Sequence, residues 1–71
     1  MSEKEEAIHS AISERARKAL QELGLTDYEV RAYLALVEMG PLTASELSEL
    51  KLIPYSKVYE VLGSLDEKGF I

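Results

Sequence analysis

Two tyrosines, a serine and a lysine fall close together in the segment PYSKVYE, residues 54–60. If this segment is helical, these side chains occupy its first two turns. Lys57 can neutralise a phosphate or donate to the acceptors of guanine, and Ser56 can bond to a base edge. The rings of Tyr55 and Tyr59 can pack against thymine methyl groups, and their hydroxyls can bond phosphate oxygens. These residue types therefore suit contact with nucleic acid.

Two further residues extend this candidate contact surface. Lys51 precedes the segment and can attract a phosphate, and Ser64 lies on one flank of the same helix. The acidic residues Asp66 and Glu67 lie at the far end of the helix, away from a bound duplex. Glu60 is the exception, because it lies near the leading end and can either accept from a cytosine amino group or repel phosphate. Charge on this helix is thus segregated along its length.

Each of these residues also has an ordinary structural interpretation. Tyr55 and Tyr59 lie at the edge of the apolar stripe of the helix, where an aromatic ring is often half-buried in the core. Lys57 can form an exposed ion pair with Glu60, which would contribute little stability. Ser56 can simply assist the start of the helix. Both interpretations stay open at the level of the sequence.

The composition of the chain restricts its function class. The 71 residues carry a formal net charge of −5 and include no cysteine and a single histidine, His9. The charge argues against a general polyanion binder, so any contact with DNA must depend on positive charge concentrated locally. A disulfide framework, a thiolate metal site and an imidazole cluster are excluded. No catalytic constellation or glycine-rich phosphate loop occurs, so we expect neither enzymatic activity nor a cofactor nor a metal.

The sequence shows no sign of membrane insertion or export. Its uninterrupted apolar runs are far shorter than a membrane span. Its acidic N-terminal segment, which contains serine, does not resemble a signal or transit peptide. We expect a soluble cytoplasmic protein with one small domain at most.

Four segments with helical periodicity position the candidate residues. They are separated by Gly24, by Gly40 and Pro41, and by Pro54. The predicted helices run from about Glu3 to Leu23, from the N-cap Thr26 to Gly40, from the N-cap Thr43 to about Lys51, and from about Tyr55 to Lys68.

The second and third predicted helices begin with the same signal. Thr26 with Glu29, and Thr43 with Glu46, form capping boxes. The second helix is apolar nearly all round, so we expect it to be the central helix, surrounded by the others. The predicted buried side of the third helix is Ala44, Leu47 and Leu50. The predicted inner stripe of the last helix is Val58, Val61, Leu62 and Leu65.

A short helix, a turn of three or four residues and a longer helix make up the helix-turn-helix arrangement. In this arrangement the N-terminal turns of the second helix meet the base edges. No strand is expected before Phe70, so the predicted fold class is all-α.

The N-terminal part of the chain is predicted to be an amphipathic helix. We place this helix in residues 1–23 and a helix-turn-helix DNA-binding domain in residues 24–71. The apolar stripe of the helix belongs either to the core or to a dimer seam. A few phosphate contacts per monomer give weak, salt-sensitive binding, so we expect a homodimer on double-stranded DNA, joined through this helix. The stripe consists of Ile8, Ile12, Ala16, Ala19, Leu20 and Leu23.

Residues 23–71 resemble the N-terminal winged helix-turn-helix domain of TrmB-type transcriptional regulators. The resemblance rests on LGLTDYEVRAYLALVEMGPLTASELSEL and on IPYSKVYEVLGSLDEKGFI, which follows it closely. It implies a sequence-specific DNA-binding module of a transcriptional regulator, commonly dimeric and mostly archaeal, whose recognition helix runs from Tyr55 to Lys68. The larger sugar-sensing domain of many members has no counterpart in this sequence, so no small-molecule ligand is carried over. Phe70 and Ile71 would begin the first strand of a wing that is absent or truncated.

The sequence departs from the family pattern at three positions. Leu52 stands where the turn of the family often has glycine. Tyr55 and Gly63 stand where basic residues are frequent, which removes favourable phosphate contacts and is expected to weaken binding.

The sequence therefore predicts a helix-turn-helix of winged-helix type with an extra N-terminal helix, and a function in binding DNA. The alternative is a winged-helix module for protein interaction or dimerisation that does not bind DNA, because a fold does not determine a function. The acidic composition, the charge-poor recognition helix and the missing wing favour this alternative. Positive potential at the leading end of an exposed last helix would favour the DNA-binding function.

Overall fold

The structure, a computed structural model, describes residues 14–50 and 52–71. Its helices in these ranges are residues 14–22, α2 (Asp27–Met39), α3 (Ala44–Glu49) and α4 (Tyr55–Glu67). The described ranges contain no strand, which confirms the all-α prediction. None of the helices in them is long and apolar enough to cross a bilayer. The predicted helix of residues 1–23 is described only from residue 14 onwards.

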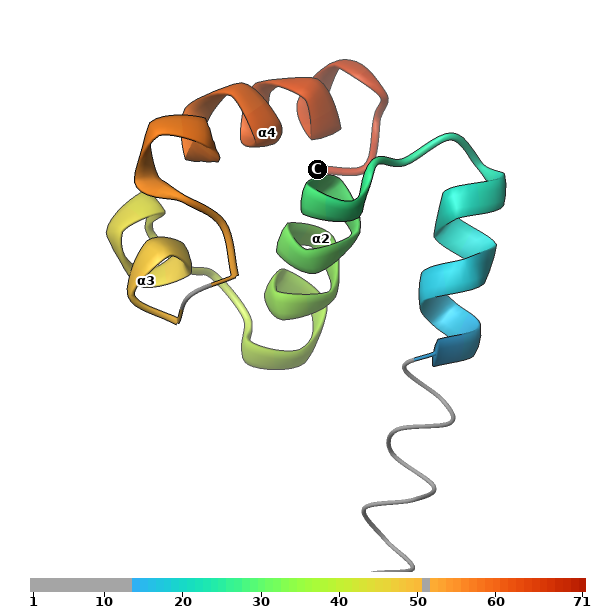
Figure 1. The fold of residues 1–71 in the computed structure, drawn as a ribbon, viewed down its shortest axis with the longest axis horizontal. Coiled ribbons are helices and arrows are strands. Elements are labelled where there is room, and N and C mark those ends of the chain that lie inside the picture. Colours follow the sequence, from blue (N-terminus) through green and yellow to red (C-terminus); the bar gives the residue numbers. More distant parts are fainter. Residues whose placement is uncertain (1–13, 51) are drawn as a thin grey trace, which may run out of the picture.

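The helices are arranged around α4 and α2. Figure 1 shows α4 running across α3 and α2, with the helix of residues 14–22 on the other side of α2. α4 packs against both α2 and α3. After α4 the chain turns back, and the ring of Phe70 packs edge-on against Tyr33 of α2 with ring centroids 5.5 Å apart.

Local signals in the sequence set the helix ends. Glu29 N donates to Thr26 Oγ1 over 3.3 Å, and Thr26 N donates to Glu29 Oε1 over 2.8 Å. Thr43 and Glu46 form the same pair of bonds, at 3.1 and 3.0 Å. α2 ends at Gly40, whose φ of 80° favours glycine over any residue with a side chain. Both predicted capping boxes and the predicted stop are confirmed.

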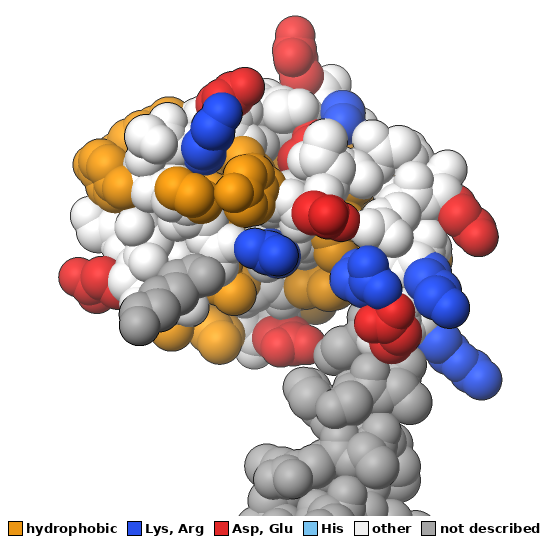
Figure 2. All heavy atoms as spheres, in the orientation of Figure 1, with side chains coloured by type: hydrophobic (Ala, Val, Ile, Leu, Met, Phe, Trp, Pro, Cys, Tyr) orange, Lys and Arg blue, Asp and Glu red, His pale blue; other side chains and the backbone are white. Residues whose placement is uncertain are grey.

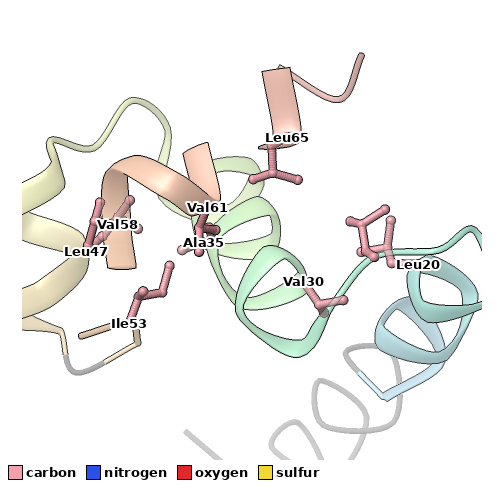
Figure 3. Close-up of a cluster of buried hydrophobic side chains, with 10 residues drawn as sticks. Leu20, Val30, Ala35, Leu47, Ile53, Val58, Val61 and Leu65 are labelled. Carbon is pink, nitrogen blue, oxygen red and sulfur yellow. The ribbon is translucent and has the colours of Figure 1, made fainter. Parts of the chain in front are cut away.

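The hydrophobic core lies between α4 and the helices that it crosses (Figure 3). Leu47, Val58 and Leu65 are fully buried, and Ile53 in the turn before α4 is 2% exposed. The predicted inner stripe of the last helix is confirmed for Val58, Val61 and Leu65, while Leu62 is half-buried. The buried hydrophobic residues are Leu20, Leu25, Val30, Ala32, Ala35, Leu47, Ile53, Val58, Val61 and Leu65.

The expectation that the second helix is surrounded on all sides is wrong for its C-terminal half. Val37 is 63% exposed and Met39 is 57% exposed. The buried residues of α2 are Glu29, Val30, Ala32 and Ala35, because α4 and Leu20 cover α2 mainly near its beginning and middle. An apolar helix surface in so small a domain therefore stays in contact with solvent.

The prediction that Leu50 is buried is also wrong, since its side chain is 45% exposed. Leu50 is the C-cap of α3, with φ −73° and ψ 1°, so the helical stripe is not continued there. The chain bends, and Ile53 takes the core position instead. Leu52 N still donates to Leu47 O over 3.3 Å, which ties the turn to α3.

Candidate nucleic-acid interface

The turn between α3 and α4 fixes where the candidate residues project. Buried Ile53 anchors the turn in the core, and Pro54 is the N-cap of α4 with an extended backbone, φ −58° and ψ 138°. Lys57 N donates to Pro54 O over 2.9 Å, which closes the first turn of the helix. α3, this turn and α4 thus form the predicted helix-turn-helix. Tyr55, Ser56, Lys57 and Tyr59 lie on the exposed side of α4.

The two tyrosines lie on the surface rather than in the core. Tyr55 is 54% exposed and Tyr59 is 68% exposed, and neither ring belongs to the hydrophobic cluster. Their rings meet edge to face, with centroids 6.2 Å apart and an interplanar angle of 88°. Hydrogen bonding with Tyr59 raises the pKa of Tyr55 above its ordinary value. The two hydroxyls therefore lie close together on the exposed side of α4.

Lys57 is exposed and available for an external partner. Among the described residues it forms no ion pair with Glu60. Figure 2 shows hydrophobic side chains, a class that includes tyrosine, beside a lysine or arginine over the first turns of α4, with an acidic side chain nearby. Lys57 and Glu60 line a shallow groove with Thr26 and Tyr28 of the neighbouring α2 region.

Ser64 is set apart from the other candidate residues by its hydrogen bond. Its hydroxyl donates to Glu29 Oε2 over 2.8 Å, and the side chain is half-buried. The structure thus brings together Tyr55, Ser56, Lys57 and Tyr59 and directs Ser64 towards α2. Lys51, the remaining candidate, lies outside the described residues.

Glu29 has a role that its place in a capping box did not reveal. The side chain is 2% exposed and accepts from Lys68 Nζ over 2.8 Å, as well as from Ser64 and the Thr26 amide. Burial raises the pKa of Glu29, but the hydrogen bonds from Lys68, Thr26 and Ser64 outweigh it and lower the pKa to about 2. Glu29 therefore joins the beginning of α2 to the end of α4 as a buried carboxylate. The sequence gives no signal for this role, because Ser64 and Lys68 are 35 and 39 residues away from Glu29 along the chain.

Comparison with known proteins gives consistent matches for most of the chain. Residues 20–71 match the family model described as "Sugar-specific transcriptional regulator TrmB". The chain is 42% identical over 60 residues to the HTH-type sugar sensing transcriptional regulator TrmBL1 of Pyrococcus furiosus, covering 84% of this chain and 18% of that protein. It is 45% identical over 60 residues to the DNA-binding HTH-type transcriptional repressor TrmBL2 of Thermococcus kodakarensis, covering 83% of this chain and 23% of the relative.

A bacterial protein has a similar identity over a shorter segment. The uncharacterized protein YrhO of Bacillus subtilis is 46% identical over 50 residues, which cover 70% of this chain and 18% of that protein. The chain thus spans about a fifth of the length of these curated relatives. No solved structure matches the chain significantly.

Proposed function

Because the chain belongs to the TrmB family of transcriptional regulators, we propose that it is a DNA-binding module that places the first turns of α4 in the major groove. The observation that carries the proposal is the exposure of Tyr55, Ser56, Lys57 and Tyr59 together at the leading end of α4. The relative described as a DNA-binding transcriptional repressor supports it. Sugar sensing, which the names of the family and of one relative mention, is not part of the proposal, since the matched segment is about a fifth of those proteins.

Each exposed residue has a distinct part in the proposed contact. Lys57 binds a phosphate or the acceptors of guanine, and Ser56 and Tyr59 contact base edges. Tyr55 contacts a phosphate through its hydroxyl or a thymine methyl group through its ring. Lys51 stays in the proposal as a further phosphate contact, whereas Ser64 is left out because its proton is engaged by Glu29.

The charge of Lys57 gives a direct test. We expect Lys57→Glu to weaken binding to a labelled duplex by about 10- to 30-fold at low salt, because it removes one phosphate contact and adds repulsion. The measurement is fluorescence anisotropy of the duplex, titrated with the chain at two salt concentrations.

Lys18→Glu is the matched control for this change. Lys18 is exposed on the helix of residues 14–22, so its replacement makes the same change in net charge away from α4. Equal losses for the two variants, with the oligomeric state of both unchanged, would show that only net charge matters and would contradict the proposal. A wild-type chain that binds no duplex at low salt would favour the protein-interaction alternative.

We further propose that two copies associate through the helix that contains residues 14–22. Its apolar stripe is divided: Leu20 is buried against the core, while Ala19 is exposed and Leu23 is 68% exposed. Leu20 thus belongs to the core, and Ala19 and Leu23 supply a surface for a second copy.

Leu23→Glu is expected to convert a dimer to a monomer, because two acidic side chains would be brought together in the apolar seam. Molar mass from light scattering after gel filtration measures the change. Leu50→Glu is the control, since it places the same charge on another leucine that is 45% exposed. A wild-type chain that is monomeric throughout the accessible concentration range would refute the dimer.

A further inference from the structure

Arg31 of α2 is held beside the turn that leads into α4. Its Nη1 donates to the carbonyl oxygen of Leu52 over 3.3 Å. The guanidinium carbon lies 5.6 Å from the centroid of the Tyr28 ring, within the range of a cation–π interaction. Helical periodicity places Arg31 on the polar side of this helix and shows none of these contacts. In the structure, a cation of α2 is fixed at the entry to α4.

The charge of Arg31 is not neutralised by the part of the chain that the structure describes. Arg17 pairs with Glu14, and Lys68 pairs with Glu29 over 2.8 Å, but Arg31 has no carboxylate partner there. A guanidinium carries five N–H donors, and the Leu52 carbonyl accepts from one of them. Arg31 is exposed, so the remaining donors can reach a ligand.

Arg31 and Lys57 each share a surface groove with Tyr28. Tyr28 lines one groove with Arg31, Leu52 and Pro54, and it lines a second groove with Lys57. Figure 2 shows separate lysine or arginine side chains on this face, with hydrophobic side chains between them. One cation of α2, beside the turn before α4, and one in the first turn of α4 therefore lie near the leading end of α4.

We propose that Arg31 is a second phosphate-binding residue of this face, which binds the DNA backbone next to the groove entered by α4. This inference rests on the proposed function. The planar guanidinium can bond two phosphate oxygens at once through parallel N–H groups, a fixed geometry that a lysine ammonium does not offer. Because Tyr28 and the Leu52 carbonyl already hold the side chain, Arg31 loses less conformational freedom on binding than a free arginine would. Phosphate contacts of this kind fix the register of a recognition helix without reading sequence.

The salt dependence of binding tests the inference. Affinity for a fluorescein-labelled duplex of mixed sequence is measured by anisotropy between about 50 and 200 mM salt. We expect Arg31→Gln to reduce the slope of log K against log salt by about 0.9 per protomer, the value for one lost phosphate contact. Arg31 is exposed, so the variant is expected to fold. Arg31→Lys keeps the charge and should restore the slope, with an affinity that stays about two- to threefold below wild type.

Arg15→Gln is the matched control, because Arg15 is exposed on the helix of residues 14–22. If the wild-type chain binds and Arg31→Gln has the wild-type slope, or if Arg15→Gln lowers the slope equally, the inference is overturned and the proposed function stands. If the wild-type chain binds no duplex at low salt, the proposed function fails and the inference fails with it. Thermal melting of each variant, followed by circular dichroism, verifies that the changes in slope belong to folded protein.

Discussion

Replacing Leu47 by alanine is expected to leave most of the domain unfolded at 25 °C. Leu47 is fully buried, with a relative exposure of 0%. It packs beside Val58 where α3 meets α4 (Figure 3). Truncating a buried leucine costs about 3 to 5 kcal/mol through lost transfer free energy and the cavity left behind. A core of this size supplies roughly 3 to 5 kcal/mol in total, so the change removes nearly all of the stability.

Urea denaturation followed by circular dichroism measures this effect, and Leu50→Ala is its control. Leu50 is the C-cap of α3 but is 45% exposed. Its truncation is therefore expected to lower the free energy of unfolding by less than about 1 kcal/mol. Equal costs at the two positions would mean that α3 does not pack as described. Because Leu47 holds α3 against α4, the variant should also lose the ordered face of Tyr55 and Lys57 and bind DNA weakly.

The contrast between Leu47 and Leu50 shows which parts of this fold the sequence could predict. Capping boxes at Thr26 and Thr43 act within one helical turn, so local chemistry was sufficient to locate both helix starts. The same periodicity placed Leu47 and Leu50 on one stripe. The stripe ended where α3 ended, and only the bend of the turn, with Ile53 entering the core, decided which leucine was buried.

The candidate site, like the fold, could be predicted from the sequence only in part. The chemistry of Tyr55, Ser56 and Lys57 could be inferred from residue type and helical position. Whether the rings lay in the core or on the surface depended on how α3 and α4 cross, and the surface position of Tyr59 follows from that crossing. Arg31 was harder to assign, because its contacts with Tyr28 and Leu52 join residues up to 21 positions apart.

The buried carboxylate of Glu29 is expected to make the folded chain less stable in acid. In the folded chain its pKa is about 2, against an ordinary value of 4.5. A carboxylate whose pKa is lowered by folding contributes its full stabilisation at any pH above its pKa in the unfolded chain. This contribution is lost as the pH falls from about 4.5 through about 2. The difference corresponds to on the order of 3 kcal/mol, most of which Lys68, Ser64 and the Thr26 amide supply through their hydrogen bonds.

Glu29→Gln removes the titrating group and keeps the shape of the side chain. We expect it to be less stable than wild type at pH 7, because Lys68 loses its charged acceptor, and to converge with wild type towards pH 2. The measurement is the free energy of unfolding in urea from pH 7 down to about pH 2, taken as the difference between the two proteins.

Glu22→Gln is the matched control, because Glu22 is exposed and forms no hydrogen bond through its side chain in the part of the chain that the structure describes. Its free energy of unfolding should run parallel to that of wild type over the whole range. If the Glu29→Gln curve also runs parallel, the carboxylate is not held between α2 and α4 as described. If it converges as expected, Lys68→Met provides the reciprocal test, since the buried carboxylate would then lack its cation and its pKa would rise. That variant should shift the acid transition to higher pH without altering the exposed face of Tyr55 and Lys57, which lies at the opposite end of α4.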